Sequence, residues 1–180
     1  GGVIIPPENY FSKVQILLKK YGVLFIADEV ICGFGRTGNM WGSDTFNLKP
    51  DILTCAKALS GAYAPISALL INETIVSEIE NQANELGIFG HGFTYSAHPM
   101  SAAIALRTLE IYEEKKIVDH VRKMEKSFTE RVKSLKKYDF VGDVRAVGLI
   151  GAIEFVSEPG SNKKPDPSRK VSAKIQQKIQ

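Results

Sequence analysis

Two ionisable side chains, Asp28 and Lys57, each follow directly after a short run of apolar residues. The runs, 23–27 and 52–56, have the length and composition of strands buried on both faces, as in parallel sheets. Because ligands bind at the carboxyl ends of strands in open α/β sheets, we expect the carboxylate and the amine to share one sheet edge. A lysine amine forms Schiff bases with carbonyl compounds, so the pair predicts covalent chemistry on a carbonyl cofactor.

Pyridoxal phosphate is a carbonyl cofactor that uses both groups, since its ring nitrogen needs an acid partner to stay protonated. The protonated ring absorbs the electrons left behind when a substrate loses its α-proton. A simpler interpretation makes Asp28 a strand-end cap and Lys57 one of the chain's 23 basic residues. Each residue alone favours the simpler interpretation, but their shared position at the ends of two strands favours it less.

The glycine-rich segment 33–38 offers a different chemistry, because it matches the dinucleotide-binding pattern G-x-G-x-x-G. That pattern requires a tight turn from a strand into a helix, whose amino end meets a pyrophosphate. Here residues 28–32 separate the strand from the first glycine, and the residues after Gly38 have no helical period. We therefore reject dinucleotide binding.

The composition, 44% hydrophobic and 24% charged, is that of an ordinary globular protein. The formal net charge of +3 argues neither for nor against a nucleic-acid partner. No apolar run approaches the roughly eighteen residues that span a membrane. Cys32 and Cys55 lack the spacing of a metal site, so we expect no metal and a reducing, cytoplasmic setting.

The spacing of apolar residues predicts helices that alternate with strands, an α/β arrangement. The expected elements are a helix from Pro6-Pro7-Glu8 to Tyr21, strands at 23–27 and 52–56 around a loop at 31–50, a strand at 66–71, a helix from Asn72 or Thr74 to Leu86, a loop at 88–99, a helical stretch at 100–137 broken near Lys115-Lys116, a strand at 147–156, an exposed loop at 157–170 and a helix from Val171. The connection between strands 52–56 and 66–71 is too short for a parallel crossover, so these two should pair antiparallel. An apolar stripe on the second half of the long helical stretch should pack against the core; it comprises Val121, Met124, Phe128, Val132 and Leu135.

The stretch LFIADEVICGFGRTGNMWGSDTFNLKPDILTCAKALSGAYAPISALLI closely resembles the signature of class III (ω-type) aminotransferases. GGVIIPPENY before it and FGHGFTYSAHPMSAAIAL after it resemble the same family, so the likeness covers most of residues 1–156. It implies the fold of pyridoxal-phosphate-dependent transferases of the aspartate aminotransferase type (fold type I). Residues 1–97 would be part of the cofactor-binding large domain, 98–138 the connecting long helices, and 139–180 the truncated start of the small C-terminal α+β domain.

The resemblance also implies roles for four residues. Asp28 would pair with the pyridine nitrogen, and Val30 would pack on one face of the ring. Lys57 would form the Schiff base with pyridoxal phosphate and, once displaced by substrate, move a proton between carbon atoms. Thr94 resembles a threonine that donates to the cofactor phosphate of a neighbouring subunit, which implies a homodimer; alternatively, its hydroxyl satisfies only the local backbone. Glu29 resembles a family position, but no role follows for it.

The expected function is therefore transfer of an amino group from an amine or ω-amino acid to a keto acid such as pyruvate. Another reaction on the same scaffold, such as that of an aminomutase or a decarboxylase, is the alternative. The chain begins without methionine and ends inside an expected helix, so we expect an interior fragment, which without its missing pocket residues could be non-catalytic. The expected partners are small-molecule substrates and a second copy of the chain, with no nucleic acid and no membrane.

Overall fold

The computed structural model describes residues 2–179, whose contacts form two compact units. The larger unit runs from Pro6 to His120, and the smaller combines the residues up to Ile5 with the chain from Val121 onward. Each unit has its own sheet. The division into domains expected from the sequence, with a change near residue 138, stays a prediction.

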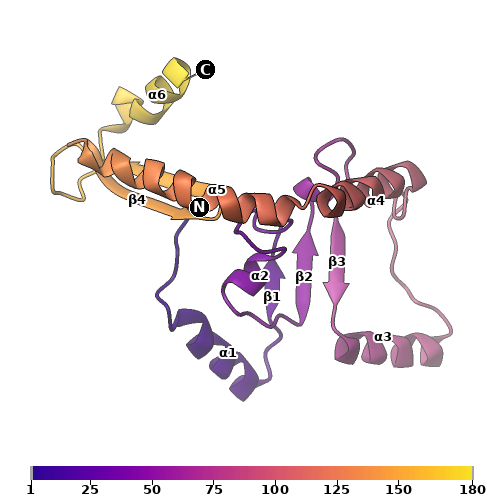
Figure 1. Ribbon diagram of the computed structural model, residues 1–180. Coiled ribbons are helices and arrows are strands. Elements are labelled where there is room, and N and C mark those ends of the chain that lie inside the picture. The colour runs from indigo at the N-terminus through magenta and orange to yellow at the C-terminus, as the bar shows by residue number, and fades with distance from the viewer. Residues whose placement is uncertain (1, 180) are drawn as a thin grey trace. The chain divides into compact units, whose positions relative to one another are not determined.

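The larger unit contains a three-stranded sheet of order β1-β2-β3. Strand β1 (Ile26–Asp28) pairs parallel with β2 (Ile52–Cys55), and β3 (Ala68–Ile71) pairs antiparallel with β2, as Figure 1 shows. The expected antiparallel pairing of the second and third strands is confirmed. Asp28 is thus the last residue of β1 and lies opposite Thr54 of β2.

The expectation that the first strand is buried on both faces is wrong. Ala27 is buried, but its neighbour Ile26, which points to the opposite face, is 58% exposed. In β2, Leu53 and Cys55 are buried, while Ile52 and Thr54 are half-buried. A continuous apolar run predicts two faces shielded from water, but among the described residues only the face of Ala27 is covered.

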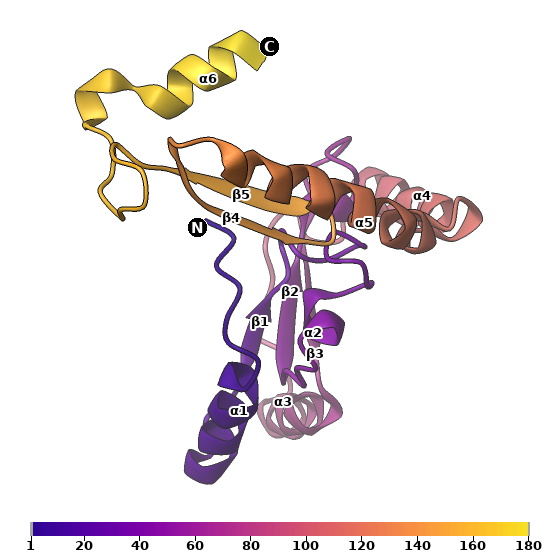
Figure 2. The same cartoon turned by 60° about the vertical axis from the view of Figure 1, so that its left-hand side comes forward.

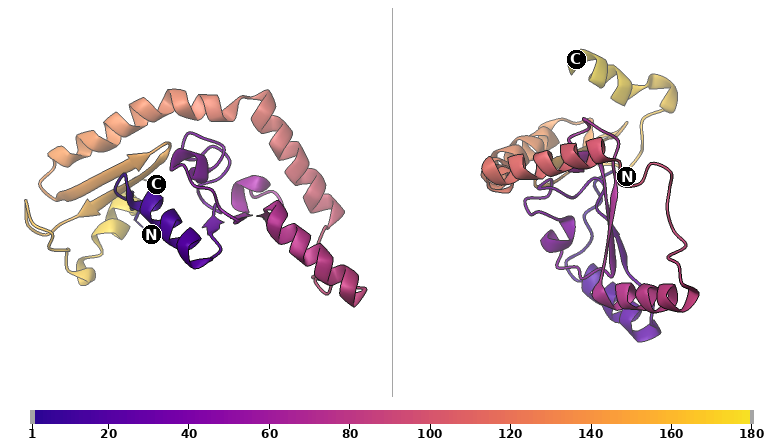
Figure 3. Two further views of the ribbon diagram at one scale, coloured as in Figure 1. Left: turned by 90° about the horizontal axis from the view of Figure 1, so that it is seen from below. Right: turned by 90° about the vertical axis from the view of Figure 1, so that its right-hand side faces the viewer.

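Helix α1 (Tyr10–Tyr21) ends at Gly22 as expected, and α3 (Glu73–Leu86) ends at Gly87. Asn72, and not Thr74, caps α3, because its side chain accepts a hydrogen bond from Ile75 N at 3.0 Å. Helices α1 and α3 lie toward the end of the sheet where β1 and β2 begin, and α4 (Pro99–Glu114) lies toward the opposite end (Figure 1 and the right panel of Figure 3). The expected loop at 31–50 contains one short helix, α2 (Gly42–Thr45), whose four residues are too few to produce a helical period.

The core of the larger unit lies where the carboxyl end of β2 meets the glycine-rich segment, the 3₁₀ helix η1 (Lys57–Leu59) and α4. Its buried members are Phe34, Leu53, Cys55, Leu59 and Ala105, with Met40, Trp41, Ala58, Ile66, Leu109 and Tyr112 packed around them. The end of the sheet that carries the candidate chemistry is therefore supported by packed side chains from three separate segments.

In the smaller unit, β4 (Val141–Val147) and β5 (Ile150–Phe155) form an antiparallel hairpin. The strand expected at 147–156 is therefore partly wrong, since its first residues belong to β4 and to the turn. Gly148 adopts a left-handed φ of +54° that reverses the chain inside an apolar run. Strand β4 was missed because charged residues interrupt it.

Four helical elements and a loop complete the C-terminal part of the chain. The helical stretch breaks as expected near Lys115-Lys116, since α4 ends at Glu114 and α5 (Ile117–Ser134) follows, extended by η2 (Leu135–Lys137). The exposed segment after β5 contains the 3₁₀ helix η3 (Pro167–Arg169), and α6 (Val171–Ile179) follows where a helix was expected. Within the described residues, no helix is both long and apolar enough to cross a membrane.

The apolar stripe of α5 packs against the β4–β5 hairpin, which runs alongside the helix in Figure 2. Val121 is buried, and a Cβ atom added to Gly151 of β5 would lie 3.1 Å from Phe128 Cζ and 3.4 Å from Val132 Cγ2. The absence of a side chain at residue 151 allows this close approach. Val121, Phe128 and Val132 thus have the expected packing role, whereas Met124 is 44% exposed.

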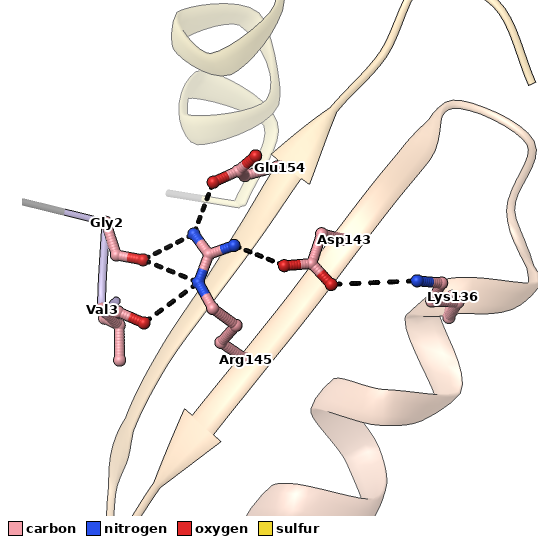
Figure 4. Close-up of polar contacts among 6 residues, drawn as sticks. All are labelled: Gly2, Val3, Lys136, Asp143, Arg145 and Glu154. Carbon is pink, nitrogen blue, oxygen red and sulfur yellow. Dashed lines mark hydrogen bonds and ion pairs between the residues drawn. The ribbon is translucent and has the colours of Figure 1, made fainter. Parts of the chain in front are cut away.

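Arg145 of β4 fastens the N-terminal segment 2–5 to the hairpin (Figure 4). Its guanidinium donates to the carbonyl oxygen of Gly2 at 2.6 Å and to that of Val3 at 3.0 Å. It also binds Glu154 at 2.5 Å and forms a hydrogen-bonded ion pair with Asp143. The hydrogen bond from Arg145 holds the pKa of Asp143 below its ordinary value.

Candidate functional site

The structure places Asp28 and Lys57 at the same edge of the sheet. Strands β1 and β2 are parallel and in register, so their carboxyl ends finish together. Asp28 is the last residue of β1, and Lys57 follows β2 after one intervening residue, Ala56. The edge thus carries one carboxylate and one amine on adjacent strands.

The Asp28 carboxylate is exposed and held by one of its two oxygens. Oδ1 accepts a hydrogen bond from Val30 N at 3.1 Å and another from Thr54 Oγ1 at 3.4 Å. Among the residues that the structure describes, none donates to Oδ2. One oxygen therefore fixes the orientation of the carboxylate, and the other is available to a ligand.

Lys57 combines a constrained backbone with a side chain that the described residues leave without a hydrogen bond or an ion pair. Its φ is +44°, in the left-handed region that is unfavourable for residues with a side chain. Its carbonyl oxygen accepts from Ser60 N and Ala62 N, both at 3.3 Å. The buried Ser60 hydroxyl then donates to Ala64 O at 2.6 Å and completes the turn. Such backbone strain persists only where the surrounding structure enforces it, and it is common at functional sites.

Glu29, for which no role followed from the family resemblance, is a buried carboxylate that fixes the segment beyond β1. It is 3% exposed and accepts hydrogen bonds from Gly42 N at 2.9 Å and from Ser43 N and Ser43 Oγ at 2.6 Å each. These donors form the amino end of α2, where backbone N–H groups favour an acid. In the sequence, the acidic residue next to Asp28 was the available signal for this role. The role could not be assigned because the partners of Glu29 lie 13 and 14 residues further along the chain.

Two glycines of this segment, Gly33 and Gly42, allow protein atoms to approach each other closely. A Cβ atom added to Gly33 would lie 2.9 Å from both Glu29 O and Trp41 Cζ3, and one added to Gly42 would lie 2.8 Å from Cys32 Cβ. Burial raises the pKa of the Cys32 thiol, and the carboxylates of Glu29 and Asp28 raise it further. Cys32 is therefore a poor candidate for a nucleophilic thiolate at this edge.

The other two predicted site residues differ in position. Val30 follows the acid pair and is half-buried, whereas Thr94 is exposed in the segment 88–98 between α3 and α4. This segment extends away from the sheet in the right panel of Figure 3. None of its hydrogen bonds in the described chain reaches Asp28, Val30 or Lys57, so the roles of all four residues stay predictions. No cluster of three or more possible metal ligands occurs in the part of the chain that the structure describes.

Comparisons with known proteins agree on one family. The family model described as Aminotransferase class-III matches residues 1–178. A relative from Solanum lycopersicum, gamma aminobutyrate transaminase 2, is 52% identical over 162 residues, which are 90% of this chain and 35% of the relative. Gamma-aminobutyrate transaminase 1, mitochondrial, from Oryza sativa subsp. indica is 51% identical over 90% of this chain and 31% of its own length.

Solved structures give the same result for the fold. A transaminase solved with L-ala has a TM-score of 0.91 and 46% sequence identity, covering 96% of this chain and 41% of the other. The omega transaminase from Pseudomonas jessenii in complex with PMP has a TM-score of 0.88 and 45% identity, covering 92% and 36%. The expected transferase fold is confirmed, although the chain spans only about a third of the length of these curated relatives. On both sequence and structure, the chain belongs to the class-III aminotransferase family.

Proposed function

We propose that the chain carries the lysine and the acid of a pyridoxal-phosphate-dependent aminotransferase. The whole enzyme would transfer an amino group from an amine or ω-amino acid, such as γ-aminobutyrate, to a keto acid such as pyruvate. The observation that carries the proposal is that Lys57 and Asp28 lie at the same edge of the sheet, and that no described residue pairs with the Lys57 amine or donates to Asp28 Oδ2. The names of the relatives, γ-aminobutyrate and ω-transaminases, support an amine donor of this class.

The donor set at the edge fits pyridoxal phosphate. Lys57 Nζ would hold the aldehyde end covalently, Asp28 Oδ2 would accept the N–H of the pyridine ring, and Val30 would cover one ring face. When bound, the cofactor supplies an electron-withdrawing ring that stabilises negative charge on the carbon bearing the donor's amine.

The residues of this chain then have separate tasks. Asp28 keeps a proton on the ring nitrogen, and Val30 N and Thr54 Oγ1 orient its carboxylate for this. Once the incoming donor amine has displaced Lys57 Nζ, the lysine amine would hold the proton that leaves the donor carbon, so it must be a neutral base at that moment. Glu29 and its three hydrogen bonds keep the segment beyond Asp28 in place.

The proposal includes a homodimer in which Thr94 of one chain donates to the cofactor phosphate of the other. Its support is that every residue of the segment 88–98, which carries Thr94, is exposed. The cytoplasmic location expected from the cysteines stays a prediction, and relatives from Solanum lycopersicum and Oryza sativa are named mitochondrial.

Labelling with borohydride tests the proposal directly. The protein is incubated with pyridoxal phosphate and reduced, and the modified residue is located by mass spectrometry. We expect one adduct, at Lys57, while an exposed helical lysine such as Lys123 remains unmodified. Scattered labelling, or an adduct elsewhere, would refute the assignment of the lysine.

Turnover gives the second test. Lys57→Ala should lower the rate of amino transfer from γ-aminobutyrate to pyruvate in the holoenzyme by about 10²–10⁴-fold, the usual contribution of a general base. Lys123→Ala serves as the matched control and should leave the rate unchanged. Product analysis separates amino transfer from decarboxylation or from migration of the amine within one molecule.

A further inference from the structure

A phenol from α4 holds the turn that carries the lysine. Tyr112 Oη donates to the carbonyl oxygen of Ala58 at 2.6 Å, across a sequence separation of 54 residues. Ala58 directly follows Lys57 in η1, and its carbonyl also accepts from Gly61 N at 3.2 Å. The Tyr112 hydroxyl therefore restrains the lysine turn from outside the turn itself.

The backbone conformation of Lys57 explains why the turn needs this restraint. A left-handed φ of +44° is unfavourable for lysine, so contacts must keep the residue there. The other hydrogen bonds to η1, from Ser60 N, Gly61 N and Ala62 N, come from residues that follow within the same turn. Local bonds of this kind can move together with the turn, whereas the bond from α4 fixes the turn to a separate element.

Tyr112 is itself well anchored. Its ring packs against Phe34 with a centroid separation of 6.1 Å, and Phe34 packs against Trp41 at 5.0 Å. Burial raises the pKa of Tyr112, so the phenol keeps its proton and remains a hydrogen-bond donor at neutral pH. The ring thus connects the segment after β1 to the turn after β2, the two parts of the chain that carry the site.

We propose that Tyr112 is a positioning residue for Lys57: its hydroxyl keeps the lysine turn in the left-handed conformation that places the amine at the edge shared with Asp28. The inference rests on the proposed function, because it assigns to Lys57 the covalent attachment of pyridoxal phosphate. Tyr112 itself needs no contact with cofactor or substrate.

The test compares Tyr112→Phe, which removes one oxygen and keeps the ring, with Tyr21→Phe in α1. Tyr21 is 68% exposed, and its hydroxyl has no hydrogen-bond partner among the described residues. On mixing the apo form of the whole enzyme with pyridoxal phosphate, adduct formation at Lys57 should be about tenfold slower in Tyr112→Phe, since a displaced reactive group loses rate steeply. Turnover per bound cofactor should fall by a similar factor with KM within about twofold, and Tyr21→Phe should match the wild type.

A second background separates positioning from general support of the fold. In Lys57→Ala, the cofactor binds without the covalent bond, and its Kd is measured by absorbance titration. Adding Tyr112→Phe should change this Kd by less than about twofold, because the hydroxyl acts through the absent lysine. The same loss in both backgrounds would show a structural role and overturn the inference.

Different outcomes would contradict the proposed function and the positioning role of Tyr112. An adduct at Lys57 that forms equally fast in the wild type and in Tyr112→Phe overturns the positioning role and leaves the proposed function intact. An adduct away from Lys57 in the wild type overturns the proposed function and, with it, the role of Tyr112.

Discussion

Glu29 in the larger unit and Arg145 in the smaller unit are both charged residues that hold backbone distant in sequence. Glu29 is 3% exposed and accepts from two backbone N–H groups and one hydroxyl. The Arg145 side chain is 19% exposed and donates to two backbone carbonyls and two carboxylates. One anchor is a buried anion held by neutral donors, and the other is a half-buried cation with charged partners at the surface.

The difference predicts how each anchor fails. No basic side chain pairs with Glu29 among the described residues, so the N–H and O–H dipoles of Gly42 and Ser43 stabilise its carboxylate. Because Glu29 is buried, water cannot solvate this carboxylate if those donors move away. The carboxylates around Arg145 are well exposed, with Glu154 at 57% and Asp143 at 44%, and water can replace their partner. Removing Glu29 should therefore affect stability more than removing Arg145.

Glu29→Ala should have the largest effect on stability. It leaves Gly42 N and Ser43 N buried without an acceptor, and each such loss costs about 1–3 kcal/mol. We expect the free energy of unfolding to fall by about 3 kcal/mol or more in urea denaturation. Glu73→Ala, at an exposed position of α3, is the control; a similar small loss in both variants would contradict the anchoring role.

Glu29→Gln should have an intermediate effect and isolates the charge. The amide oxygen can take the place of only one carboxylate oxygen, and accepts either from Ser43 or from Gly42. The amide nitrogen then faces the other of these two N–H donors and cannot accept from it. We expect a loss of about 1–2 kcal/mol, smaller than for alanine, in the same denaturation experiment. Equal losses in the two variants would mean that the charge, and not the count of acceptors, decides the stability of this segment.

Arg145→Met should loosen the N-terminal segment 2–5 and leave the rest of the fold intact. Gly2 and Val3 would lose their hydrogen bonds to Arg145, while β4 and β5 keep their ladder. We expect backbone NMR order parameters at these two residues to fall from about 0.85 to about 0.6 or below. Arg145→Lys should recover only part of the order, because an ammonium group cannot donate in a fork. Unchanged order parameters in Arg145→Met would contradict the clamp.

Lowering the pH should produce the smallest change in stability among these predictions. The hydrogen bond from Arg145 lowers the pKa of Asp143 from its ordinary value of 3.8, so its stabilising contribution is complete above that value and is lost as the pH falls through the lowered pKa. The difference in thermal midpoint between the wild type and Arg145→Met should therefore shrink as the pH is lowered from 6 to about 2. A difference that grows on acidification would contradict the assigned partner.

Short-range signals predicted much of the fold. The helix start at Asn72 or Thr74, the glycine after α1 and the break near Lys115-Lys116 depend on residues within a few positions of each other. The antiparallel pairing of β3 with β2 followed from the short connection between the two strands. The edge shared by Asp28 and Lys57 followed from two apolar runs of similar length.

Long-range contacts decided the features that the sequence could not show. The partners of Glu29 lie beyond a glycine-rich segment, and the hydroxyl that holds the Lys57 turn comes from α4. Strand β4 was hidden because its Asp143 and Arg145 interrupt the apolar pattern; Arg145 binds the carbonyl oxygens of Gly2 and Val3, and Asp143 pairs with Arg145. The left-handed backbone of Lys57 has no local signal, since lysine does not favour that conformation.

The attachment of Gly2 and Val3 to Arg145 can form only after the ribosome has synthesised β4. The N-terminal segment belongs to the smaller unit, while Pro6 to His120 between its two parts form the larger one. At about 5–20 residues per second, a ribosome needs on the order of ten seconds to add the residues that separate the segment from β4. During that interval segment 2–5 has no Arg145 to bind. A ribosome-stalled chain ending before β4 would therefore contain segment 2–5 without its attachment to the hairpin.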